Sequence, residues 1–205
     1  MRSGTLVAAA VALLSLGLIG GGIAAAQQGG SQKEMTPEQK AAMEAWMKAA
    51  TPGEGHKVLE PTIGNWTATT TMWEAPGAPP QQSEGTAENA WVLGGRFVRE
   101  TVHGEFNGMK FEGLGYTGYD NFKKQYVGAW MDTMGTMMMI STGTADPSGK
   151  VITATSTMDD VTTGTKVAVR EVTKIVDANK HVFEMYGAGP SGKEFKMMEI
   201  VYTRR

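Results

Sequence analysis

The spacing of apolar residues changes once along this chain, near Gly64. Before that point, apolar side chains recur at helical spacing on one face, at Met43, Trp46, Met47 and Ala50. The start "MTPEQ" has the capping and proline pattern of a helix N-terminus, and "TPG" ends the segment. This pattern predicts one amphipathic helix over residues 36–52, with its apolar face packed on the body of the fold.

After Gly64 the apolar residues alternate with polar ones, which is typical of strands. Ten segments rich in Thr, Val and aromatic residues are expected to be strands: 64–74, 84–93, 96–106, 109–119, 124–132, 135–145, 150–158, 165–177, 180–187 and 194–204. Short turn signals join most of them, such as "GG" at 94–95 and "NG" at 107–108, and 75–82 is the one longer loop.

Evenly spaced strands joined by tight turns predict an all-β, up-and-down antiparallel arrangement. Ten such strands are too many for a flat open sheet, and closing the sheet removes its exposed edges. We therefore expect a β-barrel domain over residues 56–205, preceded by the single helix.

The amino terminus predicts export. Arg2 is followed by the apolar run "LVAAAVALLSLGLIGGGIAAA", and Ala24 and Ala26 occupy the two small positions before a cleavage site. This predicts a signal peptide over residues 1–26, a flexible polar linker over 27–35, and a periplasmic or secreted mature protein. A membrane anchor is the alternative, but the run is broken by three glycines and lacks a basic flank.

Composition excludes several classes. The chain has 205 residues, of which 179 remain after cleavage, enough for one domain with a sizeable core. It contains no Cys, so disulfides and thiolate metal sites are excluded. The formal net charge is −2 and there is no basic patch, so nucleic acid is not an expected partner. No further membrane span is expected, and the oligomeric state is left open.

"IGNW" at 63–66 places a Gly-x-Trp signature at the head of the first strand. It resembles the opening of the calycin group of β-barrels, which includes lipocalins and fatty-acid-binding proteins. The resemblance implies that Trp66 closes one barrel end and packs on a basic residue of the last strand, for which Arg204 is the candidate.

The stretch 113–144 contains "GYDN" leading into an aromatic strand, then "W-x-D-x-M-G" and a final Thr-Gly-Thr. It resembles a family of exported bacterial proteins described only as a domain of unknown function. The resemblance extends from "MTPEQ" to the end of the chain. It implies a calycin-like barrel and implies no activity.

Methionine is concentrated in "MDTMGTMMMIST" at 131–142, which holds five of the 15 methionines. If 135–145 is a strand, Met137 and Met139 share one face and Met138 takes the other. Thioethers bind Cu(I), and His103 or His181 would have to complete such a site. Methionine also fills cores and lines adaptable cavities. The sequence favours a role in lining a cavity or packing the core over a metal site, and it does not distinguish cavity lining from core packing.

Charged residues interrupt apolar strands. Val98, Glu100 and Val102 share a face, so Glu100 is in the lumen if the valines are. Arg170 is then a candidate partner for Glu100 or for a ligand carboxylate. The alternative is that these charges lie on the outer surface. Trp130 and Tyr116 are further candidates, either for contacting a ligand or for packing.

No catalytic template is found. The three His lack metal-ligand spacing, and neither a Gly-x-Ser-x-Gly elbow nor a phosphate-binding loop is present. We therefore expect a non-catalytic protein without a cofactor that binds a small, largely apolar molecule in the barrel. The predicted ligand-binding residues are Trp130, Tyr116, Met137, Met139, Glu100 and Arg170. Two alternatives stay open: an envelope structural or interaction protein whose barrel is filled by its own side chains, and a haem- or copper-binding protein.

Overall fold

The computed structural model describes residues 34–160 and 163–205. The predicted signal peptide and most of the predicted linker lie outside the described residues. The described helices are α2 (Pro37–Ala50), α3 (Glu54–Lys57) and the 3-10 helix η1 (Glu60–Thr62). Ten strands follow: β1 (Gly64–Met72), β2 (Gln81–Val92), β3 (Phe97–Phe106), β4 (Met109–Asp120), β5 (Gln125–Asp132), β6 (Met139–Ala145), β7 (Val151–Asp160), β8 (Thr165–Asp177), β9 (Lys180–Ala188) and β10 (Glu194–Arg204).

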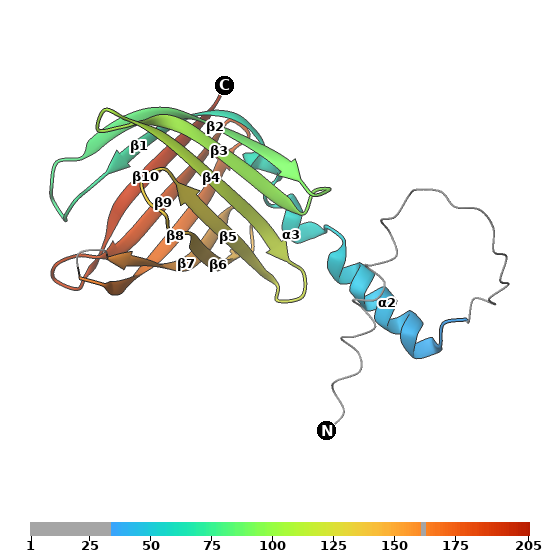
Figure 1. The fold of residues 1–205 in the computed structure, drawn as a ribbon. Helices are drawn as coiled ribbons and strands as arrows, with labels where there is room; N and C mark the ends of the chain where they lie inside the picture. The colour runs from blue at the N-terminus through green and yellow to red at the C-terminus, as the bar shows by residue number, and fades with distance from the viewer. Residues whose placement is uncertain (1–33, 161–162) are drawn as a thin grey trace, which may run out of the picture. The chain divides into compact units, whose positions relative to one another are not determined.

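The strands form a closed antiparallel barrel, which confirms the predicted fold class. Each strand pairs with its neighbours in sequence, and β1 pairs with β10 to complete the ring. Figure 1 shows this closure, with β1 beside the last strand, drawn in red. The turns follow the sequence signals: Asn107 and Gly108 both have positive φ, as the "NG" hairpin between β3 and β4 requires.

One predicted strand, 135–145, was wrong over its first four residues. Residues 133–138 are turn and loop, and β6 begins only at Met139. Asp132 explains why a turn follows β5, because its Oδ1 accepts a hydrogen bond from the backbone N–H of Met134 at 2.9 Å. The alternation predicted for Met137 and Met138 therefore does not apply, because neither residue is on a strand.

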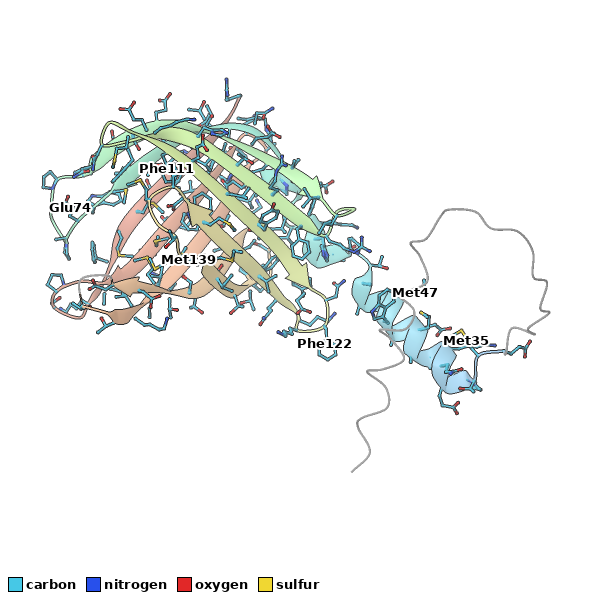
Figure 2. All side chains as sticks on the ribbon, in the orientation of Figure 1. Met35, Met47, Glu74, Phe111, Phe122 and Met139 are labelled. Carbon is cyan, nitrogen blue, oxygen red and sulfur yellow. The ribbon has the colours of Figure 1, made fainter. Side chains whose placement is uncertain are left out.

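The amphipathic helix exists, but its expected packing was wrong. The helix α2 has no buried residue, and the side chains of Trp46 and Met47 are 60% and 55% exposed. Figure 2 labels Met47 on this helix. The end of the helix is bound through polar groups: the Asn121 side chain donates to the carbonyls of Ala49 and Thr51 at 3.0 and 2.7 Å.

One end of the barrel is closed by residues 54–63, which we call the plug. Leu59 is buried with Val98, Tyr126 and Ile152 from three strands. Tyr126 also donates from its hydroxyl to the carbonyl of Gly55 at 3.0 Å. The plug therefore combines apolar burial with a hydrogen bond that holds its backbone to the barrel. We call this the plugged end.

Candidate functional site

The barrel contains a cavity of about 640 Å³. Its lining extends from Leu59 and Thr62 of the plug to the loop 133–138, at the opposite end of the strands. This volume lies within the range that proteins use to enclose a small molecule, about 300–1,000 Å³. The barrel is therefore not filled by its own side chains.

Strand register aligns one row of lining residues across five strands. Asn89 of β2 is directly opposite Glu100 of β3, which is opposite Gly115 of β4. The row continues through Trp130 of β5 to Met139 of β6. Directly opposed residues point to the same face of a sheet, so these positions form one continuous band on the cavity wall.

Glu100 is a buried carboxyl group in this band. Part of its side chain faces the cavity, whereas its Oε1 is not reached by solvent and has no hydrogen-bond partner among the described residues. Burial raises the pKa of Glu100, and a hydrogen bond donated by the Tyr202 hydroxyl opposes that shift. This is the luminal placement that Val98 and Val102 predicted.

Two more unpaired polar atoms lie near the plugged end. Asn89 donates from Nδ2 to the carbonyl of Thr62 at 3.0 Å, but its Oδ1 has no partner among the described residues. His181 Nδ1 is also unpaired there, although the ring stacks on Tyr202 at 4.2 Å and meets Trp66 edge-on at 4.4 Å. Burial and the nearby Arg204 lower the pKa of His181 to about 4, so the imidazole is neutral at neutral pH.

Trp130 is positioned by a hydrogen bond and by two glycines next to its ring. Its Nε1 donates to Asp132 Oδ2 at 2.8 Å. A Cβ atom added at Gly113 would lie 2.4 Å from the ring, and one at Gly115 would lie 3.0 Å from it. The two glycines of β4 therefore make the space that the indole occupies, and Asp132 fixes its orientation.

Methionine is the most frequent side chain in the lining. Eight methionines contribute: Met72, Met134, Met137, Met138, Met139, Met158, Met185 and Met198. Three of them, Met134, Met137 and Met138, are between 46% and 57% exposed although they line the cavity. They therefore lie at its mouth, which we call the methionine end. Figure 2 labels Met139 and another lining residue, Phe111.

The structure separates Arg170 from this site, so the predicted pairing with Glu100 was wrong. Arg170 lies between Val169 and Glu171, which are both buried, and its own side chain takes the outer face. There it forms two hydrogen bonds with the carboxylate of Glu194, at 2.9 and 2.6 Å. Its neighbour Glu171 takes the inner position and accepts a hydrogen bond from Ser156 at 2.6 Å.

Tyr116, another predicted ligand-binding residue, does not point into the cavity. It is opposite Arg99 and Ala129, at positions that alternate with Glu100 and Trp130. Its side chain is therefore directed to the outer face, even though the residue borders the cavity.

Trp66 and Arg204 lie in the contact that the resemblance implied. Trp66 is fully buried and donates from Nε1 to the carbonyl of Thr62 at 2.9 Å. The guanidinium carbon of Arg204 lies 4.2 Å from the centre of the Trp66 ring. Arg204 also donates to the carbonyls of Ile63, Pro61 and Ala178, so it joins the plug to the strands.

Sequence reasoning missed Asn89, His181 and Tyr202 as members of the polar group around Glu100. Asn89 follows from alternation with Ala87 on β2, but only the strand register places it opposite Glu100. Tyr202 comes from β10, which is separated from β3 in the ring by β1 and β2, and no local pattern indicates that its hydroxyl meets Glu100.

His103 shows the opposite outcome. It is exposed and its position alternates with Val102, so it does not join His181. Among residues 34–160 and 163–205, no three His, Asp or Glu gather in a way that would hold a metal ion. In the same residues, no helix is both long enough and apolar enough to cross a membrane.

Solved structures share this architecture. The crystal structure of Rv2717c from M. tuberculosis matches with a TM-score of 0.56 and 16% sequence identity, covering 76% of this chain and 99% of that chain. The S-type phycobiliprotein lyase CPES from Guillardia theta matches with a TM-score of 0.53 and 10% identity, covering 73% of this chain and 91% of that chain. At these identities the likeness concerns the fold.

A comparison with the curated proteins gives no match. A family model described as a protein of unknown function, DUF1579, matches residues 51–204. Because this match includes the plug and the whole barrel, the chain belongs to the DUF1579 family.

Proposed function

We propose that this protein binds a small, largely apolar molecule inside the barrel and carries no catalytic activity of its own. The observation that supports this most directly is the 640 Å³ cavity, whose wall combines methionine and aromatic side chains with a few polar groups. A cavity with a mainly apolar wall and few polar groups is the usual form of a small-molecule site.

The arrangement suggests how a ligand would lie. The exposed methionines surround the mouth, and Glu100, Asn89 and His181 lie toward the plug. A ligand would enter at the methionine end with its polar group first. Unbranched thioether side chains adapt to ligands of different shape, so they suit an entrance.

The signal peptide predicted from the sequence supports a role outside the cytoplasm. The proposed signal peptide ends at Ala26, which would place the mature barrel in the periplasm or outside the cell. There it would carry or sequester its ligand.

The test is a double substitution on the cavity wall. Trp130→Ala with Met139→Ala should weaken binding of an apolar fluorescent probe by at least about tenfold, because both side chains give up buried apolar contact. The matched control is Leu114→Ala with Met131→Ala, a directly opposed pair on the outer face of β4 and β5. If both double variants bind the probe with equal affinity, the cavity wall at Trp130 and Met139 is not part of the binding site.

A further inference from the structure

The charged residues that line the cavity restrict the charge of the ligand that it can bind. Six residues that border it are acidic, and three of these, Glu100, Asp132 and Glu171, occupy inward-facing strand positions. The side chains of the other three, Glu84, Glu105 and Asp159, take the outer face by strand alternation. None of the lining residues is Lys or Arg. Within the described residues, Asp159 is the only one of the six with an ion-pair partner, Lys166 at 2.9 Å.

An anionic ligand would therefore meet carboxylates and no cation. Barrels that hold a carboxylate group need an Arg or Lys to pair with it, because a buried charge without a partner is costly. Arg170, which the sequence suggested as a partner for a ligand carboxylate, is paired with Glu194 on the outer face. The cavity thus disfavours fatty acids and other organic anions.

The unpaired atoms near the plug specify hydrogen-bond donors. Asn89 Oδ1 can only accept a hydrogen bond, and one of the two N–H groups on Nδ2 donates to the carbonyl of Thr62. Glu100 Oε1, on the directly opposite position, is likewise unpaired, and the other polar contact of this carboxyl group comes from Tyr202. A ligand group placed between the two strands must donate at least to Asn89.

We propose that the ligand carries a positively charged nitrogen on an apolar body, with its N–H groups donating to Asn89 Oδ1 and Glu100 Oε1. This inference rests on the proposed function and narrows it to the class of apolar amines. A primary ammonium group offers three donors and one positive charge. It therefore supplies both the donor that Asn89 lacks and the charge partner that Glu100 lacks.

Trp130 adds a second contact of the right kind. A Cβ atom at Gly115 would lie 3.0 Å from the Trp130 ring and 3.6 Å from Glu100 Cβ, so the indole and the carboxyl side chain flank the same glycine. Cations are stabilised over the face of an indole ring within about 6 Å. An ammonium group at Glu100 thus has an aromatic neighbour as well as a carboxylate.

A neutral hydroxyl ligand is the competing class. It could donate to Asn89, and Glu100 would then keep the neutral form that burial favours. A cation instead favours the ionised carboxylate, because an opposite charge nearby stabilises it. The two classes therefore differ in how strongly they depend on the charge of Glu100.

The experiment compares decylamine, 1-decanol and decanoate by isothermal titration calorimetry with the ligand-free barrel protein at neutral pH. The three probes share one chain length and differ in the end group. We expect decylamine to bind at least about tenfold more tightly than the other two, as a charge-assisted hydrogen bond would give.

The outcomes separate this inference from the proposed function. Equal or tighter binding of decanol or decanoate would overturn the amine inference and leave the proposed binding function standing. Binding of none of the three would count against both.

Two variants locate the effect. Glu100→Gln should reduce the preference for decylamine over decanol to about twofold or less, while decanol binding shows that the variant is folded. Glu88→Gln makes the same change of charge on the outer face, one residue from Asn89, and should keep the preference. A Glu100→Gln protein that still prefers the amine as strongly as the unchanged protein would overturn the assignment.

Discussion

At the scale of single residues, burial in the barrel shifts the pKa values of two side chains in opposite directions. Glu100 is a carboxyl group whose pKa is raised by burial, and His181 is an imidazole whose pKa is lowered to about 4 by burial and by Arg204. Both shifts favour the neutral form in the folded protein. Because one group is an acid and the other a base, their effects on stability have opposite pH dependence.

Glu100→Gln should stabilise the ligand-free protein at pH 8 and have a much smaller effect at pH 4. Below the ordinary carboxyl pKa of 4.5, Glu100 is protonated whether the chain is folded or unfolded. As the pH rises above that value, the unfolded chain loses the proton more readily than the folded one. The free energy of unfolding then falls by at most about 1.4 kcal/mol per pH unit from this group.

Urea unfolding of the variant and the unchanged protein at pH 4 and pH 8 measures this effect. The difference in free energy of unfolding should move in favour of Glu100→Gln as the pH rises. A difference that stays constant would mean that Glu100 does not titrate abnormally.

His181→Phe should make the protein less sensitive to acid. His181 titrates near 6.5 in the unfolded chain and near 4 in the folded one, so the unfolded chain binds more protons between these values. The unchanged protein therefore loses about 3 kcal/mol from this group as the pH falls from 6.5 to 4. Phe keeps a ring against Tyr202 and removes the titration.

Thermal or urea unfolding between pH 4 and 7 should thus give a flatter curve for His181→Phe. Its absolute stability at pH 7 can shift in either direction without affecting this test, since the slope is compared. Parallel curves for the two proteins would contradict the assigned role of His181.

At the scale of elements, β4 and β5 build the site together. The glycines of β4 admit the Trp130 ring, and Asp132 at the end of β5 both orients that ring and starts the loop 133–138. One carboxylate thereby connects the band across the cavity wall with the methionine end. A change in either strand should consequently affect the position of Trp130.

Gly113→Ala is the change that tests this. Its new methyl group would lie 2.4 Å from the Trp130 ring, so the ring must move, at a cost of about 1–3 kcal/mol. We expect a lower unfolding temperature and a changed tryptophan emission spectrum. Gly104→Ala on β3 is the matched control, because its added atom would meet nothing nearer than 3.5 Å. Equal effects of the two substitutions would contradict the close fit of Trp130.

The elements also show what the sequence could predict. The ten strands and the closed meander follow from alternation and turn signals, because each is a local pattern. The plug was missed because α3 and η1 have only four and three residues, too short for a helical period to appear. The turn that precedes the late start of β6 at Met139 begins with one side-chain contact of Asp132, which alternation does not report.

The candidate site likewise contains some residues that local sequence patterns could predict and others that they could not. Alternation could say only that Glu100 shares the face of Val98 and Val102, and the structure shows that this face is the luminal one. The partner was wrong because Arg170 and Glu171 are adjacent, and choosing which one points inward requires the strand phase. Contacts across the barrel, such as Tyr202 with Glu100, join strands far apart in sequence and carry no local signal.

At the scale of the whole molecule, one end of the barrel is closed and has polar groups, and the other end is an opening lined by methionines. The plug, Trp66 and Arg204 close one end by hydrogen bonds and ring contacts. The other end is lined by exposed methionines. This asymmetry gives the cavity a direction, with polar recognition at depth and adaptable apolar contact at the mouth, and it underlies the proposal of a ligand-binding protein.

Native mass spectrometry of the mature protein, purified gently from the cells that make it, tests the binding proposal most directly. We expect a species heavier than the polypeptide, whose added mass disappears on denaturation and is reduced in the Trp130→Ala, Met139→Ala variant. The bare polypeptide mass as the only species, together with no uptake of apolar probes, would contradict ligand binding in the barrel.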